Sequence, residues 1–113
     1  MNGSEIIRQL VLREISDDYE NVDQIIFPSV LEACAKRGVK IERSNVVEAL
    51  AGLIEDGLAK AYVLSGTKPY STELPGMPSL EIVEVHFKTH FYITKKGVDL
   101  LRSYVGLPFG DLD

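Results

Sequence analysis

The amino-acid sequence predicts an α+β fold, mainly α, in which a three-helix core carries a β-hairpin and a closing C-terminal helix. Three observations lead to this prediction. Apolar residues recur at helical spacing in residues 42–56, they alternate in residues 83–93, and the period changes from the second pattern to the first within HFYITKKGVDLL, residues 90–101. With 113 residues, of which 45% are hydrophobic, the chain has the size and composition of a single domain.

The N-terminal part of the chain is predicted to form two helices. Residues 4–16 carry an apolar stripe, and Ser4 is a candidate N-cap. The polar stretch DDYENVD separates them from a second helix, for which Pro28 suits the first turn and Gly38 suits the end. The residues expected on its buried face are Phe27, Val30, Leu31 and Cys34.

A short turn leads to the clearest helix of the sequence, residues 42–56. Ser44 is a candidate N-cap and Gly57 a candidate C-terminal stop. A strand is expected at residues 59–65. Residues 66–80 contain three prolines and two glycines, so they are predicted to be an irregular loop.

The alternation in residues 83–93 predicts a half-buried antiparallel strand that pairs with residues 59–65. Thr94 is expected to cap the closing helix. Gly97 has no side chain, which would let this helix lie close to the sheet. Residues 106–113 are expected to be a short tail. The strand residues expected to face the core are Val83, Val85, Phe87, Thr89, Phe91 and Ile93.

Composition and charge limit the function classes. The net charge is −5, and six of the 17 acidic residues lie in residues 1–23, so the remaining 90 residues are close to neutral. No segment approaches the roughly 18–20 apolar residues that cross a bilayer. A signal peptide is not expected, because Glu5 and Arg8 interrupt the first apolar stretch. Cys34 is the only cysteine, which excludes an internal disulfide and favours a cytoplasmic protein with this residue in its core.

The sequence favours neither a metal site nor an enzyme. His86 and His90 share one face of the predicted strand but lie about 13 Å apart, too far to bind one ion. The acidic pairs Asp17–Asp18 and Glu55–Asp56 lie at helix ends without an apolar pocket that would shift a pKa. The chain has no nucleophile elbow, phosphate loop or dinucleotide fingerprint. We therefore expect no catalytic residue, metal or cofactor.

Two stretches resemble the winged-helix superfamily, especially MarR-like and PadR-like bacterial transcription regulators. VVEALAGLIEDGLAKAYVL resembles their recognition helix running into the wing, and FYITKKGVDLL resembles their strand-to-helix exit. The resemblance covers roughly residues 4–105. It implies a winged helix, in which residues 42–56 form the recognition helix in the major groove of DNA and residues 59–93 form the wing.

The implied function is that of a DNA-binding transcriptional regulator, expected to act as a dimer. Arginine and asparagine can read guanine and adenine edges, and basic residues beside the turn can bind phosphates. Against this, Glu42, Glu48, Glu55 and Asp56 leave the recognition helix three units negative. The residues expected to face bases are Arg43, Ser44 and Asn45, and those expected on phosphates are Lys36, Arg37, Lys40 and Lys96.

The alternative is a winged-helix module for protein interaction or scaffolding without DNA binding. The long loop at 66–80 is apolar and stiffened by proline, which suits docking on a protein partner or on a second copy of the chain. The same side chains could instead cover the sheet of their own domain. Helix 4–16 is a further candidate dimer interface. The loop residues that would form the interface are Tyr70, Leu74, Met77 and Leu80.

Overall fold

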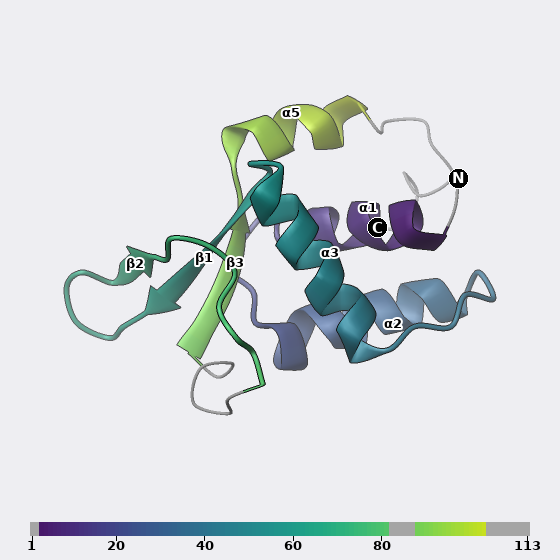
Figure 1. Cartoon of the computed structure of the whole chain (residues 1–113), viewed down its shortest axis with the longest axis horizontal. Helices are drawn as coiled ribbons and strands as arrows, with labels where there is room; N and C mark the ends of the chain where they lie inside the picture. Colours follow the sequence, from purple (N-terminus) through teal and green to yellow (C-terminus); the bar gives the residue numbers. More distant parts are fainter. Residues whose placement is uncertain (1–2, 82–87, 104–113) are drawn as a thin grey trace.

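The computed structural model describes residues 3–81 and 88–103. These residues form four α-helices, a π-helical segment and a three-stranded antiparallel sheet, so the fold is α+β and mainly helical, as predicted (Figure 1). The elements are α1 (Gly3–Glu14), η1 (Val22–Ile26, π-helical), α2 (Phe27–Ala35), α3 (Arg43–Glu55), β1 (Ala59–Leu64), β2 (Ser71–Glu73), β3 (Thr89–Ile93) and α5 (Lys95–Ser103).

The core lies between the helices and one face of the sheet. Helices α1 and α3 lie side by side, and α2 packs against both. Helix α5 follows β3 and lies near the point at which α3 ends and β1 begins (Figure 1). Burial of apolar side chains from all these layers is the main force that holds them together. The largest fully buried side chains include Leu12, Ile15, Ile26, Leu50, Leu53 and Phe91.

Glycine ends both α2 and α3, as the sequence predicts. Gly38 and Gly57 adopt φ values of 71° and 76°, in the left-handed region that favours glycine. In each case the next residue closes the helix, since Val39 donates its backbone N–H to Cys34 and Leu58 donates to Leu53, at 2.9 and 2.8 Å. Gly38 therefore determines where α2 ends and where the turn toward α3 begins.

The sheet has the strand order β2-β1-β3. The predicted pairing of the segments near 59–65 and 83–93 is confirmed for β1 and β3, with Ala59 opposite Ile93 and Val63 opposite Thr89. The prediction of a wholly irregular loop at 66–80 is wrong, because Ser71–Glu73 form β2 and pair with the other edge of β1. Prolines lie only on either side of this short segment, so its own backbone amides remain available for the ladder.

Strand β3 shows the predicted alternation over the part that is described. Thr89, Phe91 and Ile93 are buried, whereas His90 and Tyr92 are half-buried on the opposite face. Residues 82–87, which include the predicted core positions Val83, Val85 and Phe87, lie outside the described residues.

The segment between α1 and η1 is attached to the free edge of β3. Glu20 and Phe91 exchange two backbone hydrogen bonds, at 3.0 and 2.9 Å. The buried Asn21 then caps η1 by accepting from the backbone N–H groups of Asp23 and Gln24, and its amide nitrogen donates to the carbonyl of Thr89 at 3.3 Å. One side chain therefore joins the start of the helical segment to the sheet.

Helix α5 is capped and docked as expected. The Thr94 hydroxyl accepts from the backbone N–H of Gly97 at 3.1 Å and donates to the carbonyl of Gly57 at 2.7 Å. A Cβ atom at Gly97 would lie 2.3 Å from the Leu58 carbonyl oxygen and 2.6 Å from Ile93 Cγ1. Only glycine allows this close approach of α5 to the junction of α3 and β1.

Three local predictions are wrong. Ser4 lies inside α1, which begins at Gly3, and is therefore not its N-cap. Leu31 is 40% exposed rather than buried, because one residue advances a helix by 100° and the core contacts of α2 are made by Val30 and Cys34, one turn apart. The N-cap of α3 is Glu42 rather than Ser44, because the side chain of Asn45 reaches back to accept from the Glu42 backbone N–H at 2.7 Å.

Candidate functional site

Arg43, one of the three residues expected to face DNA bases, is held within the protein. Its Nε and Nη2 atoms contact the two carboxylate oxygens of Asp23 at 2.6 and 3.0 Å, and Nη2 also donates to the Leu80 carbonyl at 3.3 Å. The hydrogen bond to Asp23 raises the pKa of Arg43 further above its usual value. The Nε–Nη2 edge of the guanidinium, which could bind guanine, is therefore engaged in joining α3 to η1 and to Leu80.

Ser44 and Asn45, which follow Arg43, differ in whether their side chains are available to contact DNA bases. Ser44 is exposed, as base contact requires. Asn45 is half-buried, and its amide oxygen is the acceptor for the Glu42 N–H that caps α3. An asparagine reads adenine through its oxygen and nitrogen together, so Asn45 would have to abandon its capping role to do so.

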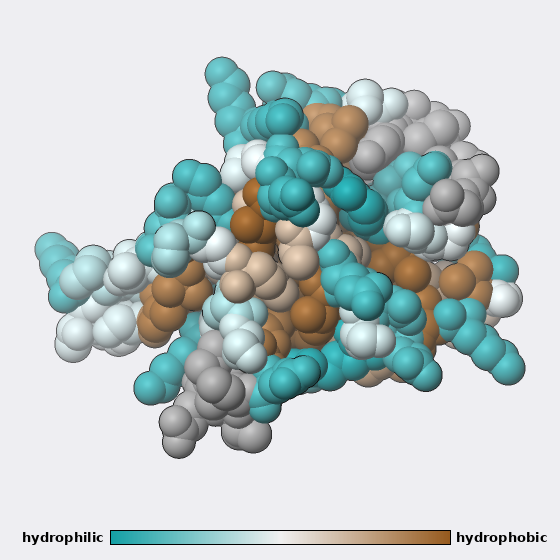
Figure 2. Space-filling model, viewed as in Figure 1, coloured by the Kyte–Doolittle hydropathy of each residue, from teal (hydrophilic) through white to brown (hydrophobic). Residues whose placement is uncertain are grey.

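The exposed side of α3 is acidic. Glu42, Glu48 and Glu55 are all exposed, and the exposed Asp56 follows at the C-cap. Asp56 is paired with Arg8 of α1, with 2.7 Å between Oδ2 and Nη2. Hydrophilic groups and apolar patches are intermixed on the face of the molecule that Figure 2 shows. Carboxylates along this helix would repel the phosphates on either side of a DNA groove.

Three of the expected phosphate-binding residues come together in the turn before α3. Lys36 and Lys40 are exposed, and the Lys36 ammonium lies 3.7 Å from the carboxylate of Glu32. Arg37 donates to the Ala33 carbonyl at 3.2 Å, one turn earlier in α2. These residues form a small basic cluster, which we call the turn cluster (Lys36, Arg37, Lys40).

Lys96 lies away from the turn cluster. Its ammonium donates to the backbone carbonyl of Asp56 at 2.8 Å, at the C-terminal end of α3. Since α3 has 13 residues, this end is roughly 20 Å from the turn cluster. The structure therefore divides the predicted phosphate-binding set between the two ends of an acidic helix.

The predicted interface in the long loop is mostly turned inward. Leu80 is buried, and Leu74 and Met77 are partly buried against the core. The prediction that Leu80 belongs to an interface is wrong, because this residue is only 4% exposed. Tyr70 is 59% exposed. Of the two interpretations of this loop, the structure favours the one in which its apolar residues cover their own domain.

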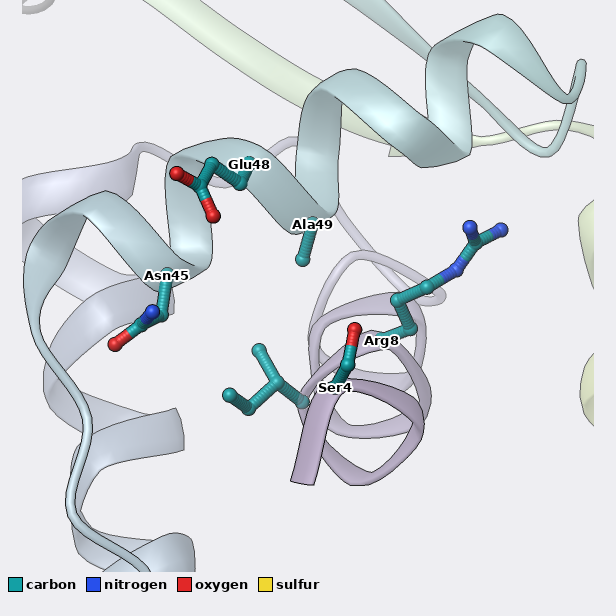
Figure 3. Close-up of a pocket in the computed structure, with 6 residues that line it drawn as sticks. Ser4, Arg8, Asn45, Glu48 and Ala49 are labelled. Carbon is teal, nitrogen blue, oxygen red and sulfur yellow. The ribbon is translucent and has the colours of Figure 1, made fainter. Parts of the chain in front are cut away.

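A shallow hollow of about 290 Å³ lies between α1 and α3 (Figure 3). Arg8 and Asn45 extend in opposite directions from it, and Arg8 is paired with Asp56. The polar groups thus do not converge on one point, as they do in sites that hold a small molecule. The lining residues are Ser4, Ile7, Arg8, Asn45, Glu48 and Ala49.

A cluster of three tyrosines on the outer face of the sheet was not predicted from the sequence. The ring of Tyr19 stacks on that of Tyr92, with 4.9 Å between centroids, and stands perpendicular to that of Tyr62 at 5.1 Å. All three residues are half-buried. Burial raises the pKa of Tyr62, and Tyr19 and Glu73 raise it further. The only sequence signal was the outward position of Tyr92 in the alternating strand; Tyr19 comes from another segment.

Glu20, next to this cluster, titrates at a raised pKa. Burial is the main cause, followed by the charges of Asp18, Glu14 and Asp17. The unfolded chain loses the Glu20 proton near the ordinary value of 4.5, whereas the folded chain retains it to higher pH. Ionisation of Glu20 therefore lowers the stability of the fold as the pH rises through this window.

We predict that Glu20→Gln is more stable relative to the wild type at pH 7 than at pH 3.5. The amide has no charge to lose, and at the lower pH Glu20 is largely protonated in both states, so the difference between the two proteins should shrink. Urea midpoints of both proteins at the two pH values give the comparison. A difference that does not change with pH would contradict the raised pKa.

We also predict that Arg43 and Asp23 are energetically coupled. Arg43→Met and Asp23→Asn should each reduce stability, and the double variant should lose less than the sum, with a coupling of about 1 kcal/mol, because the pair is bidentate but about one-third exposed. Urea unfolding of the four proteins of this double-mutant cycle measures the coupling. Additive losses would show that the two side chains do not form a stable pair in solution.

Comparison with models of known protein families, with curated proteins and with solved structures finds no match to the chain. Among residues 3–81 and 88–103, no group of three or more histidine, cysteine or acidic side chains is arranged to hold a metal ion. Over the same residues, no helix is both long and apolar enough to cross a membrane.

Proposed function

We propose that this chain is a protein-interaction module of winged-helix type, in which α3 does not read DNA. The order of helices and strands, with a tight turn before α3 and a β-hairpin after it, supports the winged-helix assignment. Because the same fold serves several functions, the function is argued from the surface of α3 rather than from the fold.

The observation that carries the proposal is the engagement of Arg43 by Asp23. Arg43 is the only basic residue of α3, and both carboxylate oxygens of Asp23 hold its guanidinium. The exposed acidic side chains of α3 and its N-cap are then Glu42, Glu48 and Glu55. Such a helix would bring three negative charges to the groove and no free positive charge from its own residues.

The test is binding of the full chain to duplex DNA of random sequence at about 50 and 200 mM salt, conditions under which phosphate contacts differ strongly in strength. We expect no measurable affinity at either salt concentration. Glu48→Lys together with Glu55→Lys should create weak, salt-sensitive binding if the acidic face is what prevents it. Wild-type binding that weakens with salt and is lost in Lys40→Ala would contradict the proposal.

A DNA-binding transcriptional regulator is the second candidate, and the turn cluster is the observation that favours it. Lys36 and Lys40 are exposed beside the N-terminus of α3, where phosphates lie in a helix-turn-helix complex. In this case Ser44 would face the bases and Arg43 would have to leave Asp23. Arg43→Ala would then weaken DNA binding as strongly as Lys40→Ala, which separates this candidate from non-specific attraction to the lysines alone.

A further inference from the structure

The outer face of the sheet carries a cluster of three half-buried tyrosine rings in contact, which we call the tyrosine face (Tyr19, Tyr62, Tyr92). Tyr62 and Tyr92 alternate with Ala61 and Phe91, whose side chains are buried on the opposite face of the same strands. Tyr19 lies against both rings although it belongs to the segment after α1. Tyrosine is the type of residue that protein interfaces favour, since its ring is rigid and its hydroxyl can remain hydrated.

The border of the tyrosine face is negatively charged. Residues 14–20 contain four acidic residues and no basic one. Asp17 and Asp18 are exposed directly before Tyr19. The charges of Asp18, Glu14 and Asp17 contribute to the raised pKa of Glu20, so acidic side chains lie close together at this edge of the sheet.

Two basic side chains share the outer face of the sheet with the tyrosines, His90 opposite Tyr62 and Lys60 opposite Tyr92, and Arg13 precedes the acidic stretch. Lys60, on the tyrosine side of β1, is held by Glu73 at 2.9 Å. Lys88 is exposed before β3 and lies roughly 13 Å along the chain from Tyr92. The surface therefore combines partly exposed aromatic rings with an acidic border, which suits a cationic and planar group better than a neutral or an anionic one.

We propose that the tyrosine face binds an arginine-bearing segment of a partner protein. The planar guanidinium stacks on tyrosine rings and can at the same time bind the carboxylates of Asp17 or Asp18 in a bidentate manner. A lysine ammonium makes a single, strongly hydrated charge and lacks the stacking surface. The inference rests on the proposed function and gives it a binding face and a class of partner.

The experiment compares two nine-residue probe peptides, one of arginine and one of lysine, each carrying the same fluorescent label. Binding to the full chain is followed by fluorescence anisotropy. We expect the arginine peptide to bind about five-fold more tightly than the lysine peptide, as stacking on a partly exposed ring predicts. Equal affinities would overturn the proposal, because charge attraction alone would then account for binding.

Variants locate the contact. Tyr19→Ala should remove most of the preference for arginine, and Tyr19 lies outside the strands, so the ladder of the sheet is retained. Tyr62→Leu is the second variant and should act in the same way. Asp17→Asn combined with Asp18→Asn should weaken both peptides. Tyr70→Ala is the matched control, since Tyr70 is exposed but outside the cluster, and it should change nothing. Unchanged peptide binding in both cluster variants would overturn the proposal.

A single-stranded oligo-thymidine probe tests the other ligand that aromatic faces bind. We expect no binding, because the acidic border repels phosphates. Oligonucleotide binding that is lost in Tyr19→Ala would overturn the proposal in favour of nucleic-acid stacking. This outcome is distinct from failure of the proposed function, which shows as duplex binding that depends on Lys40 and not on Tyr19.

Discussion

Replacing Gly97 by alanine is expected to destabilise the fold by about 3 kcal/mol. The added methyl group would lie 2.3 Å from the Leu58 carbonyl oxygen and 2.6 Å from Ile93 Cγ1. The first of these neighbours is a backbone atom directly before β1 and cannot rotate away. Relief therefore requires α5 to move from the sheet, which would disturb the bonds from Thr94 to Gly57 and from Lys96 to Asp56. Urea unfolding followed by circular dichroism measures the loss.

Gly66→Ala is the matched control for this prediction. Gly66 is exposed between β1 and β2, and a Cβ atom there would meet no other atom within 4 Å. We expect its stability to stay within about 0.5 kcal/mol of the wild type. If Gly97→Ala were as stable as Gly66→Ala, the close approach of α5 to Leu58 and Ile93 would be contradicted.

Gly97 also illustrates which parts of the fold could be predicted from the sequence. Its position in TKKG, between an alternating strand and a helical stripe, is local information, and so are the C-terminal stops at Gly38 and Gly57. Such signals follow from backbone conformation and periodicity, which depend on neighbouring residues. They were enough to predict α3, the pairing of β1 with β3 and the capped start of α5.

Contacts between distant segments could not be predicted in this way. Asp23 and Arg43 are 20 residues apart, and nothing in either local sequence indicates that they form a pair. The same holds for β2, whose three residues form a strand only because the edge of β1 is free. Propensity alone favours a loop there, and tertiary pairing overrides it.

The prediction of the candidate site suffered most, because this site depends on contacts between distant segments. The turn cluster is contiguous in the sequence and was predicted, and the structure brings its three members together. The availability of Arg43 depends on its ion pair, and the tyrosine face depends on how a segment after α1 lies against the sheet. The residues that now argue for protein binding rather than DNA binding are therefore those whose surroundings are set by tertiary structure.

Asn21→Ala is expected to destabilise the protein by about 2 to 3 kcal/mol, a loss close to that of Gly97→Ala. The cap that Asn21 provides to Asp23 and Gln24 contributes about 1 kcal/mol. Its bond to Thr89 is buried, so removal leaves a carbonyl without this donor and adds about 1 to 2 kcal/mol. The first contribution stabilises η1 and the second stabilises the attachment of the helices to β3.

Asn21→Ser separates these two contributions. A serine hydroxyl can accept from the N–H groups of Asp23 and Gln24 but is too short to reach the carbonyl of Thr89, so we expect about half of the alanine effect. Gln24→Ala, at an exposed position beside the cap, should change stability by less than about 0.5 kcal/mol. If serine restored the full stability, the bond to Thr89 would contribute nothing. The attachment of this segment to the sheet would then depend on the backbone bonds between Glu20 and Phe91, which also hold Tyr19 beside Tyr92.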